Sequence, residues 1–150
     1  EDVVKLVEEA YSRNAAAGDV KPTCPDLAAA LAELKGRGLR LAVVTTDNEP
    51  ITRHCLTGLG ILEYFDVIFT DDGHTPTKPD PFCAGKFCRM YGLDKSRVMM
   101  VGDTMTDVRF AKNGGITAVS LAPTPEKKAL LAPHTDIIID AISELTELVK

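Results

Sequence analysis

Hydrophobic and polar residues follow one another along this chain in blocks that predict alternating strands and helices. Short apolar, β-branched runs are typical of strands buried on both faces, and apolar residues spaced by three and four are typical of helices that pack on a core. Strands are expected at residues 39–45, 66–70, 98–101, 116–120 and 137–139. Helices are expected at 2–17, from 27 to the glycines at 36 and 38, after 48, and at 81–91, 105–113, 125–131 and 142–148.

Strands and helices that alternate with short loops imply βαβ crossovers, and therefore an α/β fold with a doubly wound, largely parallel, Rossmann-like sheet. Pro22 and Pro25 exclude a continuing helix and mark the best candidate boundary, which separates residues 1–20 from 21–150. Ligands in such sheets bind beyond the carboxyl ends of the strands. The loops after Val44, Phe69 and Val101 are therefore where chemistry is expected.

Length, composition and charge narrow the class of protein. The chain has 150 residues, of which 45% are hydrophobic, so it can form one compact domain with a core. A net charge of -5 without a dense Lys/Arg run argues against nucleic acid as a partner. No apolar run approaches the roughly 18 residues of a membrane span. The first residues resemble neither a signal nor a transit peptide, and a cytoplasmic protein is expected.

The four cysteines show no CxxC spacing, so they predict reduced, mostly buried thiols rather than a metal or disulfide framework.

Asp103 and Asp107 follow a predicted strand and can project to one side of the turn that opens the next helix. Gly102, just before them, lets the backbone turn or approach a ligand closely. Two carboxylates there suit Mg²⁺, which takes one or two protein oxygens together with water and substrate phosphate. The alternative makes Asp103 a helix N-cap and Asp107 a first-turn acid favoured by the helix dipole.

Lys78 and the threonines at 45 and 46 are candidate phosphate ligands. Lys78 lies between prolines 76 and 79, in a stiff segment that could aim its ammonium at a phosphoryl oxygen. Thr45 ends the first buried strand and, with Thr46, places hydroxyl groups at the same edge of the sheet. The alternatives are a solvated surface lysine and an ordinary strand threonine.

Taken in order, Thr45, then residues 78–81 (Lys-Pro-Asp-Pro), then Gly102-Asp103-Thr104 with Asp107 resemble the haloacid dehalogenase-like hydrolases. The nearest subfamily is that of phosphoglycolate phosphatase and β-phosphoglucomutase, and the resemblance runs from about Val20 onward. It implies a Mg²⁺-dependent phosphatase of a small phosphorylated metabolite that works through an aspartyl phosphate. By position, Thr45, Thr46 and Lys78 would bind the phosphoryl group, Asp103 would bind Mg²⁺, and Asp107 would complete or buttress the metal site.

The first motif of that family, an Asp-x-Asp pair that supplies the nucleophile, is not found before Thr45. Residues 69–75 contain Asp-Asp-Gly after a strand, but Thr70 would sit where the nucleophile belongs. We therefore expect a truncated chain that is inactive alone and whose sheet is incomplete at its central strand. Residues 1–20 would be a remnant of the helical cap, residues 21–150 the core, and the missing N-terminal segment of the same gene product its partner.

Two other readings stay open. A non-catalytic phosphate- or metal-binding module of the same fold would truly lack the nucleophile. A receiver-like signalling domain would carry its acceptor aspartate at the end of the third strand, near Asp71 and Asp72, but does not call for Lys78 and Pro79 where they stand.

Overall fold

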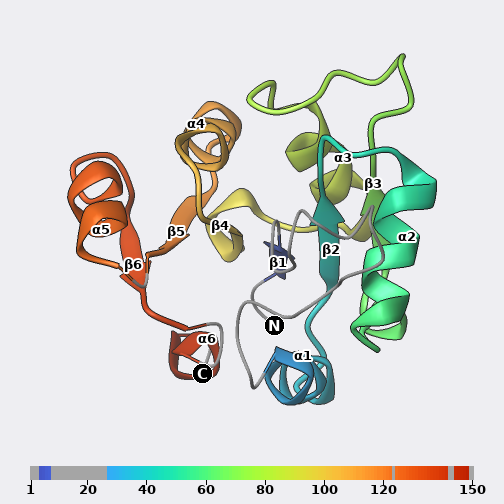
Figure 1. Cartoon of the computed structure of the whole chain (residues 1–150). Helices are drawn as coiled ribbons and strands as arrows, with labels where there is room; N and C mark the ends of the chain where they lie inside the picture. The colour runs from blue at the N-terminus through green and yellow to red at the C-terminus, as the bar shows by residue number, and fades with distance from the viewer. Residues whose placement is uncertain (1–3, 8–26, 123, 142–143, 149–150) are drawn as a thin grey trace.

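A parallel sheet of six strands forms the centre of the molecule in the computed structural model, which describes residues 4–7, 27–122, 124–141 and 144–148 (Figure 1). The strand order is β3-β2-β1-β4-β5-β6, and every neighbouring pair is parallel. Successive strands are added toward one side of β1 as far as β3 and toward the other side from β4 onward, so the strand order reverses between β1 and β4. Doubly wound folds bind their ligands at such a point. The expected α/β class with a Rossmann-like sheet is confirmed.

Most predicted elements form within two residues of their expected bounds. The strands are β1 (Val4–Val7), β2 (Leu41–Val44), β3 (Val67–Phe69), β4 (Val98–Gly102), β5 (Thr117–Leu121) and β6 (Ile137–Ile139). The helices are α1 (Leu27–Gly36), α2 (Glu49–Gly58), α3 (Phe82–Tyr91), α4 (Met105–Gly114), α5 (Pro125–Leu131) and α6 (Leu145–Leu148). Two 3-10 turns, Leu62–Tyr64 and Lys95–Arg97, precede β3 and β4.

The central strand is where the sequence-based expectation fails. Residues 4–7, expected within a helix, form β1, which pairs on one side with β2 and on the other with β4. The sheet is therefore not incomplete at its centre. Unpaired N–H and C=O groups between β2 and β4 would be costly, and a segment with valines at both ends suits a strand. The rest of the expected 2–17 helix lies outside the described residues.

Local signals set the helix ends as expected. Asn48 caps α2, because its side chain accepts a hydrogen bond from the Ile51 N–H at 3.0 Å. Gly92 and Gly115 end α3 and α4 in the left-handed conformation, with φ of 64° and 73°. These stops let each helix return the chain to the sheet.

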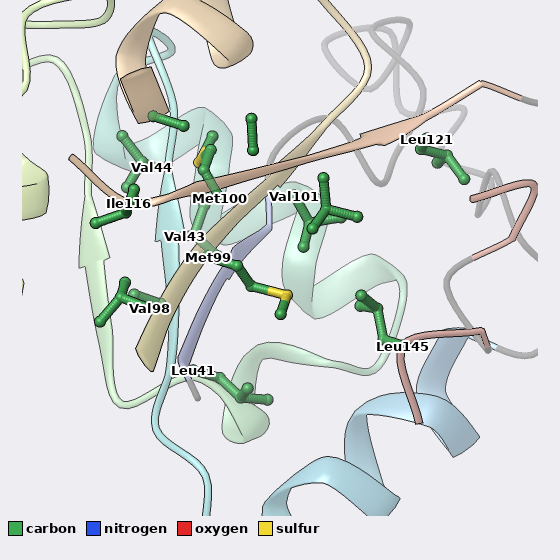
Figure 2. Packing of buried hydrophobic residues seen from close by; sticks show 14 of the residues in the cluster. Leu41, Val43, Val44, Val98, Met99, Met100, Val101, Ile116, Leu121 and Leu145 are labelled. Atoms are coloured by element: carbon green, nitrogen blue, oxygen red, sulfur yellow. The ribbon is translucent and has the colours of Figure 1, made fainter. Parts of the chain in front are cut away.

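Helices cover both faces of the sheet, with α1 beside α6 on one face and α3 beside α4 on the other (Figure 1). The core between them is built largely from β2 and β4, whose side chains are almost wholly buried (Figure 2). Three of the four cysteines, Cys55, Cys83 and Cys88, are buried free thiols as predicted, and Cys24 lies outside the described residues. Burial raises the pKa of each of the three, that of Cys83 to about 11. Among the described residues no helix is both long and apolar enough to cross a membrane.

Candidate active site

The register of the sheet brings two of the predicted site residues to the same level. Val7 of β1 pairs with Val43 of β2 and with Val101 of β4. Thr45 and Asp103 each lie two residues beyond those partners, so they flank the carboxyl end of β1. This is the point where the strand order reverses, and ligands of doubly wound sheets bind there.

Thr45 is buried, and its position is fixed by two backbone contacts. Its N–H donates to the Phe69 carbonyl at 3.0 Å, and its Oγ1 accepts a hydrogen bond from the Asp47 N–H at 3.1 Å. Thr46, next in sequence, is exposed. The two hydroxyls therefore differ: Thr45 is held in place below the sheet edge, whereas Thr46 stands in solvent.

The start of α4 explains how Asp107 is held. Thr104 is the N-cap, and Asp107 at the third helical position completes a capping box with it. Asp107 Oδ2 accepts hydrogen bonds from Thr104 Oγ1 at 2.8 Å and from the N–H groups of Asp103 and Thr104 at 3.2 and 3.3 Å. Asp107 is therefore an acidic residue in the first turn of α4, as the alternative predicted. The predicted N-cap at Asp103 is wrong, because Thr104 is the N-cap.

The other oxygen of Asp107 contacts Lys78. The Lys78 ammonium donates to Asp107 Oδ1 at 2.7 Å, and the two side chains are only 4% and 3% exposed. A solvated surface lysine is therefore excluded. Burial of an ion pair costs desolvation free energy, and such a pair persists only where its geometry and further hydrogen bonds compensate. Lys78 is thereby fixed at the edge of the sheet where Asp103 lies.

Gly102 makes room for this arrangement. A Cβ at residue 102 would lie 2.2 Å from Asp107 Oδ2, which is closer than two nonbonded atoms can approach each other. The sequence suggested that this glycine lets the backbone approach a ligand. The structure shows that it lets the backbone approach the Asp107 carboxylate.

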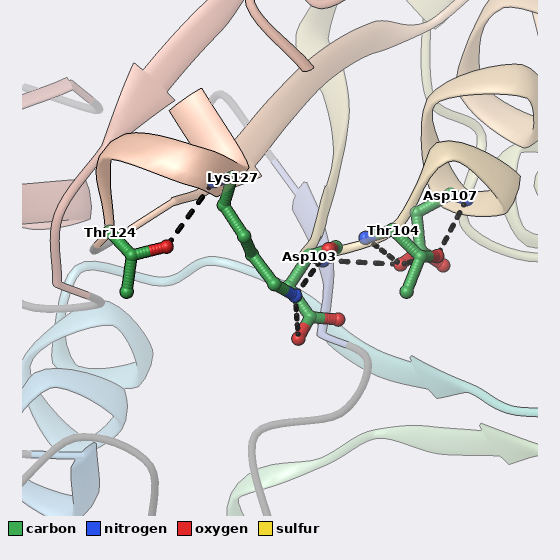
Figure 3. A network of polar contacts seen from close by, with 5 residues as sticks. All are labelled: Asp103, Thr104, Asp107, Thr124 and Lys127. Atoms are coloured by element: carbon green, nitrogen blue, oxygen red, sulfur yellow. Dashed lines mark hydrogen bonds and ion pairs between the residues drawn. The ribbon is translucent and has the colours of Figure 1, made fainter. Parts of the chain in front are cut away.

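Asp103 is bonded differently from Asp107. Its Oδ2 accepts a hydrogen bond from the Lys127 ammonium at 2.9 Å, and the same ammonium donates to the Asp103 carbonyl at 2.8 Å (Figure 3). Its Oδ1 is buried and has no hydrogen-bond partner. It is the one buried side-chain nitrogen or oxygen without a hydrogen-bond partner in the described part of the chain. Because buried polar atoms are almost always hydrogen-bonded, this exception needs an explanation.

These donors fit a magnesium site in part. Asp103 offers a buried oxygen to a hard cation, whereas both oxygens of Asp107 are already bonded within the protein. No group of three or more His, Cys, Asp or Glu side chains that could hold a metal occurs among the described residues. Mg²⁺ commonly takes only one or two protein carboxylates and completes its shell with water and substrate phosphate. Asp103 is thus the candidate direct ligand, and Asp107 the residue that buttresses it.

The Asp-Asp-Gly loop at residues 71–73 is stabilised within itself. Asp72 accepts hydrogen bonds from the N–H groups of Thr75 and His74 and from the Thr75 hydroxyl, at 2.7 to 2.8 Å. These bonds lower the pKa of Asp72 to about 2. Asp71 accepts a bond from the Gly73 N–H, and Gly73 has a φ of 80°. The loop is therefore a turn stabilised by its own carboxylates.

The sequence did not indicate Lys127 as a site residue, and it gave Thr104 only as part of the Gly102-Asp103-Thr104 motif, without its capping role. Lys127 lies in the first turn of α5, after the carboxyl end of β5. The rule that drew attention to the loops after β2, β3 and β4 applies equally to that loop. Thr104 stands at the expected N-cap distance before Asp107 and could have been read as half of a capping box.

The chain matches the model of the family described as hydrolase, haloacid dehalogenase-like hydrolase, over residues 1–115. The protein belongs to this family. The matched region contains Thr45, Lys78, Asp103 and Asp107, and it begins before Val20, from which the resemblance was expected to run. A phosphoglycolate phosphatase of Neisseria meningitidis is 33% identical over 127 residues, which cover 82% of this chain and 54% of the relative.

Solved structures share the fold. A "predicted phosphoglycolate phosphatase" from Haemophilus somnus 129pt superposes with a TM-score of 0.74 at 25% identity, covering 86% of this chain and 57% of that one. The core domain of a Streptococcus pneumoniae TIGR4 protein superposes with a TM-score of 0.73 at 20% identity, covering 99% of this chain and 95% of that one. The chain spans about half the length of the curated relatives it matches.

Proposed function

We propose that this chain carries most of the active site of a Mg²⁺-dependent phosphatase that acts on a small phosphorylated metabolite. The observation that carries the proposal is the pair of aspartates after β4. Asp103 presents a buried oxygen without a partner, and Asp107 fixes the Lys78 ammonium beside it. A site for a cation next to a site for an anion is the arrangement that phosphoryl transfer requires. The similarity to phosphoglycolate phosphatases agrees with this chemistry.

Each residue has a defined task in the proposed reaction. Thr45 and Thr46 would donate hydrogen bonds to phosphoryl oxygens, and Lys78 would neutralise the charge that develops on the transferred group. Asp103 would hold Mg²⁺, which supplies further charge neutralisation on the phosphoryl oxygens. Asp107 would orient Lys78 with one oxygen and the start of α4 with the other. Its role is positioning rather than direct ligation.

The nucleophile would come from a segment outside these 150 residues, and that segment would have to reach the carboxyl end of β1, because β1 already fills the centre of the sheet. No Asp-x-Asp pair occurs in the sequence, and the chain spans about half of its relatives. In the proposed reaction an aspartate oxygen attacks phosphorus, the P–O bond to the alcohol breaks, and the departing oxygen takes a proton from a general acid. Water then hydrolyses the aspartyl phosphate to release inorganic phosphate. The 150-residue chain alone would be inactive.

The test uses the intact gene product, expressed from its natural start, with a generic phosphate ester and Mg²⁺. Turnover is expected, and it should be lost on chelation and restored by Mg²⁺. Asp103→Asn should lower kcat by about 100-fold or more, because it replaces a charged metal ligand with a neutral one. Asp71→Asn, in the exposed loop, is the matched control and should retain activity. No turnover by the intact protein, or full activity of the Asp103 variant, would refute the proposal.

A non-catalytic module that binds phosphate or metal is the second candidate, because this sequence contains no Asp-x-Asp pair and either candidate accounts for that. It predicts that the intact gene product also lacks that pair. In that case the protein should bind Mg²⁺ or phosphate in calorimetry but release no phosphate from any ester.

A further inference from the structure

We infer that Lys127 is a positioning residue for Asp103, which it holds so that the unpartnered oxygen faces the proposed cation site. This role deepens the proposed function and rests on the proposed magnesium site at Asp103. Lys127 comes from α5, which follows β5, so it joins the site from an element outside the segments already considered. Figure 3 shows its side chain extended from α5 to the Asp103 carboxylate.

The Lys127 ammonium makes two contacts with Asp103, and together they restrict rotation of the carboxylate more than a single contact would. The ammonium reaches Asp103 Oδ2 at 2.9 Å and the Asp103 carbonyl at 2.8 Å, so it bridges the side chain and the backbone of the same residue. A carboxylate clamped to its own backbone has little freedom to rotate. One oxygen is engaged by the ammonium, and the other, Oδ1, is left buried and unpartnered. Asp103 would therefore bind a cation through Oδ1 alone.

The base of Lys127 is itself anchored. Thr124 is the N-cap of α5, and its hydroxyl accepts a hydrogen bond from the Lys127 N–H at 3.2 Å (Figure 3). Pro125 fixes the first turn. The lysine thus starts from a defined backbone position and ends on two defined acceptors. Hydrogen-bond partners that orient a metal ligand in this way typically contribute 10- to 100-fold to metal affinity.

An opposite effect of Lys127 is physically possible and can be measured. A positive charge beside a metal ligand repels an incoming cation, so a lysine that only neutralised Asp103 would weaken Mg²⁺ binding. Removal of such a lysine would tighten binding. Removal of a positioning lysine weakens it. The sign of the change in affinity therefore separates the two roles.

The experiment measures Mg²⁺ affinity of the intact gene product by isothermal titration calorimetry, without substrate, for the wild type and three variants. Lys127→Met should weaken Mg²⁺ binding by 10- to 100-fold. Lys127→Arg keeps charged donors but in a different geometry, so it should bind Mg²⁺ more tightly than Lys127→Met does. Lys128→Met is the matched control: Lys128 is the next residue of α5 and pairs at 2.9 Å with Asp140, away from Asp103. Its affinity should equal that of the wild type.

Each outcome decides between the proposals. If the wild type binds Mg²⁺ and Lys127→Met binds it equally or more tightly, the positioning role is wrong and the magnesium site stands. If the wild type does not bind Mg²⁺, both the metal site and the role of Lys127 are refuted. Turnover of phosphate esters without Mg²⁺ would then show that the phosphatase function stands without them. Thermal unfolding of each variant checks folding. A merely structural role for Lys127 would move the melting temperature and leave the Mg²⁺ affinity of the folded protein unchanged.

Discussion

Aspartates paired with lysines occur at both the amino and the carboxyl edge of the sheet, meaning the two sides at which the parallel strands begin and end. Their carboxylates are bonded differently at the two edges. At the amino edge, Asp66 precedes β3 and Asp136 precedes β6, the two outermost strands. Each carboxylate accepts the N–H of a residue in the neighbouring strand, Leu41 or Ala118, at 2.8 Å. At the carboxyl edge, the carboxylates of Asp103 and Asp107 bond instead to the start of a helix and to lysines.

The amino-edge device is complete in itself. The Asp66 N–H donates to the Leu41 carbonyl while its carboxylate accepts the Leu41 N–H, and Asp136 brackets Ala118 in the same way. Lys35 bonds to both oxygens of Asp66. Every oxygen of these two carboxylates has a partner, so they fasten the outer strands and leave nothing for a ligand. The unpartnered oxygen of Asp103 is what distinguishes the functional edge from the structural one.

The largest effect should follow Asp107→Ala. This change removes the carboxylate that contacts the buried Lys78 ammonium and also the acceptor of the Thr104 hydroxyl. Removal of one member of a buried pair typically costs about 3 to 5 kcal/mol. The free energy of unfolding, measured by urea denaturation, should fall by that amount.

A double variant separates the pair from the fold around it. Lys78→Met with Asp107→Leu replaces two buried charges with apolar groups of similar volume, which is often close to neutral. Most of the lost stability should return, whereas the intact protein should have no phosphatase activity, because the double variant lacks the Lys78 ammonium. A loss below about 1 kcal/mol for Asp107→Ala would mean that the carboxyl edge is fastened by something other than this pair.

Gly102→Ala should have the next largest effect. The new methyl group would overlap the Asp107 carboxylate, and overpacking of this kind typically costs about 1 to 3 kcal/mol. Gly36→Ala is the matched control, because nothing lies within 4 Å of a Cβ there and the residue ends a helix. Thermal unfolding of both variants should show a clear drop for Gly102→Ala and almost none for Gly36→Ala. Equal melting temperatures would contradict the close approach of Gly102 to Asp107.

The elements could be predicted from sequence because their signals are local. The cap at Asn48 and the stops at Gly92 and Gly115 act within one turn of the residues that carry them. The strand at Val4–Val7 could not be predicted. The spacing of its apolar residues is typical of a helix, whereas its place in the sheet depends on pairing with the distant strands β2 and β4. Pairing with both neighbours outweighs the local preference.

The site was predictable in its residues and not in its bonds. The sequence indicated Asp103, Asp107 and Lys78 because they follow strand ends. It did not show that both oxygens of Asp107 are already hydrogen-bonded, one to Lys78 and the other to Thr104. That division of labour depends on which oxygen each donor reaches. Lys127 was missed because no motif marks it: its contact with Asp103 joins residues 24 positions apart.

At the amino edge, Asp66→Asn should cost about 1 to 2 kcal/mol at pH 7, because the amide loses the charge-assisted bonds from Lys35. Partial burial raises the pKa of Asp66, but the bonds from Lys35 and the Leu41 N–H outweigh it and lower the pKa overall. The stabilisation is therefore fully present above the unfolded pKa of about 3.9 and is lost as the pH falls through the folded pKa. Urea denaturation at pH 7 and in acid should show the two proteins converging as the pH falls.

Asp136→Asn is the matched comparison for the other outer strand and should show the smallest effect. Its pKa is also lowered, first by the bond from the Ala118 N–H and then by Lys112, so the pH dependence should have the same sign. The Lys112 and Asp136 side chains are 47% and 40% exposed, so solvent screens the pair, and its loss should cost less than about 1 kcal/mol. A larger loss of stability for Asp136→Asn than for Asp66→Asn would contradict this comparison. It would mean that burial does not set the strength of the two contacts, and that Asp66 and Asp136 do not hold the outer strands in the same way.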